Sequence, residues 1–465
     1  MARNALAVMI ARGVDMAAGL VTLRLLAPYL GPARFGDYGF TWAFVLAMQP
    51  VVNFEMDRIL IREAARDRSR TASLWGAALL VKAVMLVPYT AVVIGAACVL
   101  PLPPGVAGAL LLAGASELFY HLHMIHSSVF QARERMDADL ALMVFFRVTL
   151  LAGIVAGVTG RRPLAFFFAA AALANVVRAI LGASVLLSRV GSPSFERARE
   201  TAREMVRSAW PLTLSAVLAA LTLNVDVFVL KAMASPEQVG YFQLAHPIIL
   251  QLQIVPGALM TALFPGFARA FAADPRVLAS FVTRAVKVFF AIGMLLALVL
   301  HGAAGLLVAL FGAGRYAAAE PVLGILALAL PAVFGLTLFS FALVSADGQK
   351  DLAAASFLGL VTNTVLDIVL VPRLGARGAA LGTSVAYFTM ASLYGVRACR
   401  RLPGSVPASL LATVLAGFGG ALGALAIARL ALPPPAAALL VAVAFAPLAL
   451  RLGWPVLRDL ARPRA

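Results

Sequence analysis

Residues 74–100, LWGAALLVKAVMLVPYTAVVIGAACVL, form a long apolar run in which Lys82 is the one charged residue. A helix rises about 1.5 Å per residue, so a run of this length can cross a hydrocarbon core of about 30 Å. The strands of membrane β-barrels instead alternate in polarity over about ten residues, which excludes a barrel here. The run therefore predicts a membrane-spanning helix.

The composition extends this prediction to the whole chain. Of the 465 residues, 62% are hydrophobic and 13% are charged, and the mean hydropathy is +0.95. A soluble protein has about 25% charged residues and could not bury so much apolar surface. These values exclude a soluble enzyme, a disordered protein and a fibrous protein, and they predict an all-α polytopic membrane protein.

Apolar runs recur along the sequence and predict about fourteen transmembrane helices, at roughly 30 residues for each span and its connection. The expected ranges are 6–29, 38–61, 74–100, 105–129, 140–160, 163–188, 206–232, 238–264, 284–311, 318–345, 352–371, 376–398, 406–430 and 435–452. Pro and Gly mark many of the breaks between them, as in residues 101–105 and 433–435.

The basic residues predict the orientation of the spans. The net charge of +17 comes mostly from Arg and Lys between the apolar runs, so we read it as topology rather than nucleic-acid binding. One set of connections is rich in Arg, and the opposite set holds only Arg34, Arg161, Arg162, Lys231, Arg315, Arg373 and Arg377. The positive-inside rule then places both termini in the cytoplasm.

An internal repeat divides the chain into two halves. The segment 31–36, GPARFG, follows the first expected helix, and the segment 235–240, SPEQVG, follows the seventh. Six helices separate the copies, so the repeat is parallel, a plan common among transporters. We expect two pseudo-symmetric six-helix bundles, over 1–190 and 206–400, joined by a charged linker helix over 191–205. Two additional helices and a basic cytoplasmic tail follow over 401–465.

Several motifs in this order resemble the polysaccharide flippases. That family shares a superfamily with multidrug and toxic compound extrusion transporters and lipid II flippases. The motifs are LLAPYLGPARFGDY over 25–38, NVD over 224–226, PEQVGYFQLA over 236–245, LFP over 263–265, FGAGRY over 311–316, SADGQ over 345–349, and Asn363 followed by PRLGARGAA over 372–380. The resemblance covers most of residues 1–400 and is weaker over the last two helices.

The resemblance implies flipping of undecaprenyl-pyrophosphate-linked oligosaccharide units by alternating access, for surface polysaccharide biosynthesis. The implied partners are the lipid-linked oligosaccharide and polysaccharide assembly proteins, and the basic tail suits anionic membrane lipids. Two alternatives stay open: a multidrug or cation antiporter of the same superfamily, and a membrane enzyme of the polysaccharide polymerase or ligase type. The antiporter would favour a cavity of acids and aromatics, and the enzyme would need a large outer loop.

Ionisable residues within spans are costly, so each is a candidate site residue. An arginine can hold a phosphate group with two donors, which makes basic residues candidates for the substrate cavity. The expected cavity residues are Arg12, Arg24, Arg58 and Arg147. The candidates for coupling to H⁺ or Na⁺, or for a gate, are Asp15, Asp226 and Asp367. The repeat also suggests that Arg24 and Asp226 form a gate pair, with a permanent salt bridge to another neighbour as the alternative.

Other polar residues receive simpler interpretations. Lys82 and Arg178 stand near helix ends and are expected to snorkel to the headgroups. His121, His123 and His126 fall on different helical faces, so we expect a wet helix end rather than a shared metal. The sequence holds no nucleophile motif, nucleotide loop or metal-hydrolase motif. It therefore predicts no catalytic residues, no metal site, no cofactor and no nucleic-acid partner.

Overall fold

The computed structural model of the chain describes residues 2–260, 275–345 and 348–401, and within these the side chains of 2–12, 275–281 and 349 are not described. The described residues are almost entirely helical and contain no strand, which confirms the all-α membrane architecture. Within the described residues, eight helical stretches are long and apolar enough to cross a membrane, or nine if the bent pair formed by 317–327 and 330–345 is one span. The last two expected helices lie outside the described residues.

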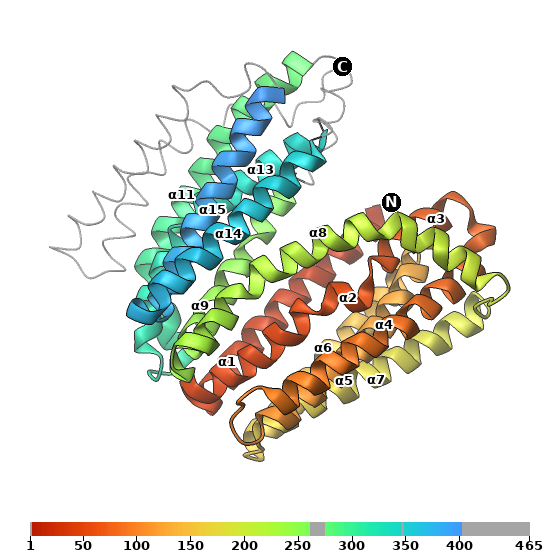
Figure 1. The fold of residues 1–465 in the computed structure, drawn as a ribbon, viewed down its shortest axis with the longest axis horizontal. Helices are drawn as coiled ribbons and strands as arrows, with labels where there is room; N and C mark the ends of the chain where they lie inside the picture. Colours follow the sequence, from red (N-terminus) through yellow and green to blue (C-terminus); the bar gives the residue numbers. More distant parts are fainter. Residues whose placement is uncertain (1, 261–274, 346–347, 402–465) are drawn as a thin grey trace. The chain divides into compact units, whose positions relative to one another are not determined.

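The chain divides into two compact units, Met1–Asn224 (unit 1) and Val225–Ala465 (unit 2). The helices of unit 1 are α1 (Ala2–Ala47), α2 (Gln49–Asn53), α3 (Met56–Arg66), η1 (Arg68–Arg70), α4 (Thr71–Val99), α5 (Val106–Ala132), α6 (Met136–Thr159), α7 (Leu164–Arg189) and most of α8 (Ala198–Met233). Within this unit α5 packs against α4 and α7, and α6 packs against α1 (Figure 1).

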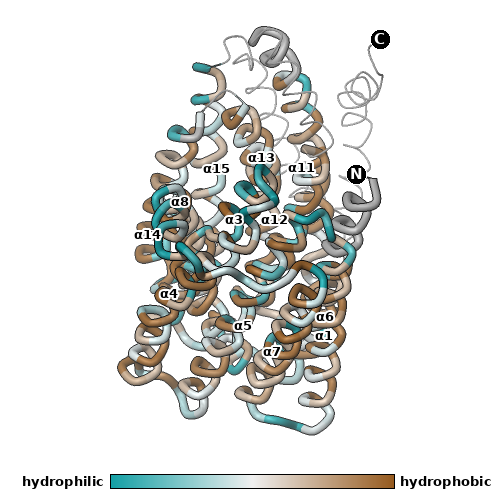
Figure 2. The backbone as a smooth tube through the Cα atoms, turned by 90° about the vertical axis from the view of Figure 1, so that its right-hand side faces the viewer, coloured by the Kyte–Doolittle hydropathy of each residue, from teal (hydrophilic) through white to brown (hydrophobic). Residues whose placement is uncertain are grey.

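The helices of unit 2 begin with the end of α8. They continue with α9 (Pro236–Leu252), α11 (Pro275–Gly312), η2 (Ala317–Ala319), α12 (Glu320–Ala327), α13 (Leu330–Ser345), α14 (Gln349–Leu374) and α15 (Ala376–Arg401). Here α15 packs against both α13 and α14, and a core of Phe289, Phe334 and Leu338 fills the space between α11 and α13. Figure 2 shows hydrophobic residues along the helices and hydrophilic residues gathered at their ends and connections.

The structure divides the first two expected spans differently. The helix α1 continues from the first expected span into the second, and the second span is then interrupted near its end. Gly31, with φ 71° and ψ 169°, kinks α1 where the sequence repeat begins, and its repeat counterpart Ser235 caps α9 in an extended conformation. The expected helix over 38–61 is interrupted because Phe54 and Glu55 adopt positive φ values of 46° and 53°. Broken spans of this kind occur in transporters where backbone lines an internal site.

The linker also differs from its prediction. Residues 191–197 are not helical, and α8 runs without a break from Ala198. Gly191 and Arg197 have positive φ values of 101° and 54°, which lie outside the range of a regular right-handed α-helix. The connection lies against α4, where a Cβ on Gly76 would come 2.0 Å from the carbonyl oxygen of Ser194. Glycine is therefore required at position 76.

Candidate functional site

Two aspartates meet in the interior of unit 2. Asp226, near the end of α8, is 1% exposed, and Asp367, on α14, is 0% exposed. The carboxyl groups lie within hydrogen-bonding reach of each other. The Oδ1 atom of Asp226 also accepts hydrogen bonds from Asn363 Nδ2 at 3.2 Å and from Thr383 Oγ1 at 2.6 Å. We call Asp226 and Asp367 the carboxylate pair.

The local sequence explains how these side chains meet. Asn363 and Asp367 are four residues apart on α14, so they share one face of the helix. Thr383 comes from α15, which packs closely on α14. At the contact stands Gly382, where an added Cβ would lie 2.4 Å from Asp367 Oδ1. A glycine at 382 therefore makes room for the second carboxylate.

Among the described residues, the hydrogen-bond partners of the carboxylate pair leave its charge unbalanced. Asn363 and Thr383 are neutral, and the single hydroxyl proton of Thr383 is shared with the carbonyl oxygen of Ala379 at 2.9 Å. Within the described residues, Asp226 Oδ2, both Asp367 carboxylate oxygens and Asn363 Oδ1 are buried without a hydrogen-bond partner. Ionised carboxylates only accept hydrogen bonds, and two of them in a membrane interior need a proton or a cation between them.

The ligand chemistry favours a hard cation. Carboxylate, amide and hydroxyl oxygens suit Na⁺, Mg²⁺ or Ca²⁺ rather than soft transition metals. In the part of the chain that the structure describes, no group of three or more His, Cys, Asp or Glu residues could hold a metal ion. The carboxylate pair therefore fits a singly charged cation or a proton better than a tightly held transition metal.

Two other expected site residues meet in unit 1. Arg147 on α6 donates from Nε to Asp15 Oδ1 on α1 at 2.7 Å, and its Nη2 group contacts the same oxygen. The guanidinium also lies 5.5 Å from the ring centre of Phe146. The Asp15 side chain is 47% exposed, so the pair is open to a ligand rather than sealed in a core.

Among the described side chains, Arg24 and Arg58 have no contact with this pair. Arg24 is exposed on α1, and the side chain of Arg12 lies outside the described residues. Arg58 contacts Glu55 at 3.1 Å while 73% of its side chain stays exposed. The proposed pairing of Arg24 with Asp226 stays a prediction. The hydrogen-bond partners of Asp226 described above all belong to its own unit.

Unit 1 holds a buried ion pair that the sequence interpretation missed. Lys82 on α4 is 4% exposed, and its Nζ lies 3.1 Å from Asp57 Oδ1 and 2.7 Å from the carbonyl oxygen of His121. The expectation that Lys82 snorkels is therefore wrong, because the ammonium is neutralised inside the unit. The position of Lys82 near the end of its expected span suggested snorkelling. The structure differs because the break at Phe54–Glu55 brings Asp57 into contact with Lys82.

The three histidines of α5 are also buried rather than wet. His121, His123 and His126 are at most 3% exposed, and Gly182 on α7 leaves the space into which His123 and His126 pack. Arg178 is likewise buried, with its guanidinium 5.0 Å from the ring centre of Phe146. The snorkelling expected for Arg178 is therefore wrong too.

Comparison with known proteins identifies the family of this chain. A family model described as polysaccharide biosynthesis protein matches residues 1–271, more than half of the chain. The chain belongs to this family. No curated protein sequence matches it.

Solved structures of the MOP superfamily share the fold of this family member. A lipid II flippase, MurJ, in an inward closed conformation has a TM-score of 0.71 at 15% identity, covering 99% of this chain and 100% of that one. An inward-facing multidrug resistance MATE transporter has a TM-score of 0.69 at 16% identity, covering 84% and 94%. A MOP transporter from Pyrococcus furiosus has a TM-score of 0.62 at 16% identity, covering 86% and 95%. The chain thus has a membrane transporter fold.

Proposed function

We propose that this chain is a flippase that moves undecaprenyl-pyrophosphate-linked oligosaccharide units across the bacterial inner membrane by alternating access. Membership in the polysaccharide biosynthesis family supports this substrate class. A diphosphate carries several negative charges, and arginines in spans are suited to hold it. Arg12, Arg24, Arg58 and Arg147 are the proposed cavity contacts, and both termini lie in the cytoplasm.

A cation at the carboxylate pair supplies the coupling. Two buried carboxylates with neutral partners are unstable unless a positive charge arrives, so occupancy of the pair depends on the ion gradient. A bound cation shifts a conformational equilibrium only if one state holds it more tightly. The pair of Asp226 and Asp367 is the single observation that carries this mechanism. Na⁺ and H⁺ both fit, and Asp15 is a further acid available to the cycle.

The decisive experiment measures surface polysaccharide and its lipid-linked precursor, not cell growth alone. Cells lacking their own flippase should regain surface polysaccharide on expression of this chain and lose it with Asp226→Asn or Arg147→Ala. Reporter fusions at residue 195 and at the C-terminus should give cytoplasmic signals. Accumulation of lipid-linked units at the inner leaflet despite full membrane insertion of the wild-type chain would refute the flippase proposal.

A multidrug antiporter is the second candidate, and the likeness to MATE transporters favours it. It predicts cation-dependent efflux of organic cations without an effect on surface polysaccharide. A polymerase or ligase is less well supported, because the connections expected on the outer side are short, as at 160–163 and 234–235. Dye efflux and polysaccharide export, measured in the same strain, separate the flippase from the antiporter.

A further inference from the structure

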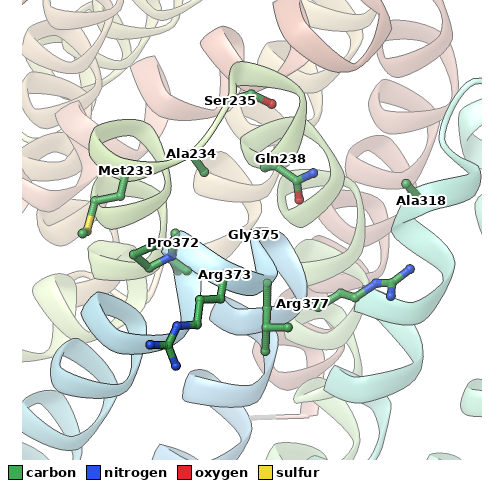
Figure 3. Close-up of a pocket in the computed structure, with 11 residues that line it drawn as sticks. Met233, Ala234, Ser235, Gln238, Ala318, Pro372, Arg373, Gly375 and Arg377 are labelled. Atoms are coloured by element: carbon green, nitrogen blue, oxygen red, sulfur yellow. The ribbon is translucent and has the colours of Figure 1, made fainter.

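Unit 2 contains a polar cavity of about 500 Å³ where α8 passes into α9 and α14 passes into α15. Figure 3 shows residues that line it, among them Ser235 and Gln238 on the α8–α9 side and Ala318 in η2. We call it the α14–α15 pocket. Its lining differs in charge from the buried carboxylate pair, because Arg373 and Arg377 line it and none of its described lining residues is a carboxylate.

The wall of the α14–α15 pocket is built around one glycine. Gly375 has φ 56°, and an added Cβ would lie 2.4 Å from Gln238 Oε1. The same oxygen accepts the backbone N–H of Ala376 at 2.8 Å. Because Oε1 is committed to this hydrogen bond, the amide group of Gln238 is held in one orientation. Its Nε2 group then remains as a fixed donor.

The donors of the pocket converge on one side. In Figure 3 the Gln238 nitrogen and the Arg377 guanidinium both extend toward Ala318, whereas Arg373 leaves the loop in another direction. Arginine and an amide NH₂ group offer only donors, and a guanidinium matches the geometry of phosphate oxygens. The pocket therefore selects an acceptor-rich anion and would repel a cation.

The charge pattern of the sequence places this pocket on the outer side of the membrane. Outer connections are normally poor in basic residues. Yet four of the seven basic residues assigned to that side belong to unit 2, namely Lys231, Arg315, Arg373 and Arg377. Each lies in or next to one of the elements that form the pocket, which are α8, α9, η2, α14 and α15. Two of these four, Arg373 and Arg377, line the pocket, where an anionic ligand would balance their charge.

We propose that the α14–α15 pocket binds a phosphate or diphosphate group carried on a lipid, with Arg377 and Gln238 as its donors and Arg373 as an electrostatic rim. This assignment rests on the proposed function, from which it takes the side of the membrane that the pocket faces. It extends that function by naming a site for the phosphate group. The pocket gives the anionic headgroup a site at the outer end of unit 2, apart from the arginines of unit 1. The same chemistry suits the diphosphate of the delivered lipid and the headgroup of an anionic phospholipid.

Binding to the purified full-length protein tests the site without transport. The protein is placed in nanodiscs of phosphatidylcholine and titrated with undecaprenyl diphosphate, with phosphatidylglycerol and with inorganic pyrophosphate. The double variant Arg373→Gln with Arg377→Gln should bind its phosphate ligand about tenfold more weakly, because charge-assisted hydrogen bonds are lost. The matched control, Arg34→Gln with Arg161→Gln, removes two exposed arginines from the same expected side and should bind as the wild type does.

A second variant separates binding from folding. Gln238→Glu keeps an oxygen for the Ala376 N–H but replaces the NH₂ donor with a negative charge, so it should also weaken phosphate binding about tenfold or more. Selective loss for undecaprenyl diphosphate identifies the substrate as the ligand, and selective loss for phosphatidylglycerol identifies a membrane lipid.

Two results would overturn the site: unchanged affinity in both pocket variants, or an equal loss in the arginine control. Failure of polysaccharide export with intact phosphate binding would instead count against the proposed function alone.

Discussion

Replacing Asp367 by Asn changes the charge of the carboxylate pair with almost no change in shape. Two unit charges about 4 Å apart repel by about 4 kcal/mol at an effective dielectric constant of about 20. Asp367 is 0% exposed, so water does little to reduce this repulsion. The amide can also donate a hydrogen bond to Asp226, which now lacks a donor on Oδ2. In buffer without a suitable cation, and at a pH at which both carboxyl groups are ionised, Asp367→Asn should therefore be more stable than the wild type.

The cation response should change in the opposite direction. A cation at a hundredfold excess over its Kd stabilises the wild type by about 2.7 kcal/mol. For a unit of a few hundred residues, 1 kcal/mol shifts the Tm by about 2–4 °C, so Na⁺ should raise the Tm of the wild type by about 5–10 °C. Asp367→Asn keeps one carboxylate and should lose most of this rise.

Thermal unfolding in detergent, with NaCl against choline chloride and at two pH values, measures both effects. Asp351→Asn is the matched control, since it removes one acid from the same helix but one paired with Arg397 and Arg401. A rise on acidification but not with Na⁺ in the wild type identifies the proton as the coupling ion. If the wild type and Asp367→Asn respond identically to Na⁺ and to pH, the carboxylate pair holds no ion and the reasoning is wrong.

Three further predictions address unit 1 and the α14–α15 loop. Lys82→Met leaves the Asp57 carboxylate buried without its partner and should cost about 3–5 kcal/mol in thermal unfolding, most of which is restored when Asp57→Leu is added. Gly375→Ala should lower stability by at least about 1–2 kcal/mol because of its left-handed φ and the contact with the amide oxygen, whereas Gly95→Ala, which meets nothing within 4 Å, should not. Arg147→Lys keeps the positive charge but makes one hydrogen bond fewer to Asp15. The level of polysaccharide export should therefore lie between those of the wild type and Arg147→Ala.

Each of these has a contrary outcome. A double variant no more stable than Lys82→Met would show that the ion pair is not what stabilises α3 against α4. Equal stability of Gly375→Ala and wild type would remove the reason for a fixed Gln238 amide. Full export by Arg147→Lys would show that a point charge suffices at that position.

The helices were predictable because their signal is long and redundant. The expected spans over 105–129 and 163–188 became α5 (Val106–Ala132) and α7 (Leu164–Arg189), within three residues at each end. The fold class followed from the same apolar runs, and the ordered motifs indicated the family that the comparison shows. Predicting a helix from an apolar run of this kind requires no knowledge of which helix faces pack together.

The partners of charged residues were not predictable in the same way. Asp226 and Asp367 are buried, as acids selected within spans should be, but the sequence places them 141 residues apart (367 − 226) and says nothing of their contact. Asn363 stands one turn before Asp367 on the same face, a signal that could have been used. Thr383 gave no such signal, because a hydroxyl in a span usually bonds its own helix.

Breaks in the backbone were the other weak point. The positive φ values of Phe54 and Glu55 occur at residues that carry no turn signature, so a single helix over 38–61 was the natural expectation. That break displaces Asp57 onto Lys82 and makes a buried ion pair out of two residues that looked peripheral. A local conformation set by tertiary packing cannot be read from local sequence.

The carboxylate pair and its partners all belong to unit 2, whereas the arginines at 24, 58 and 147 all belong to unit 1. Under the proposed function, the arginine contacts of unit 1 and the ion site at the carboxylate pair can therefore vary separately in evolution. Substitutions within residues 1–224 can then alter the proposed arginine contacts while the proposed ion site is inherited unchanged. Chimaeras that exchange this first part between relatives should then keep the ion dependence of the parent that supplies unit 2.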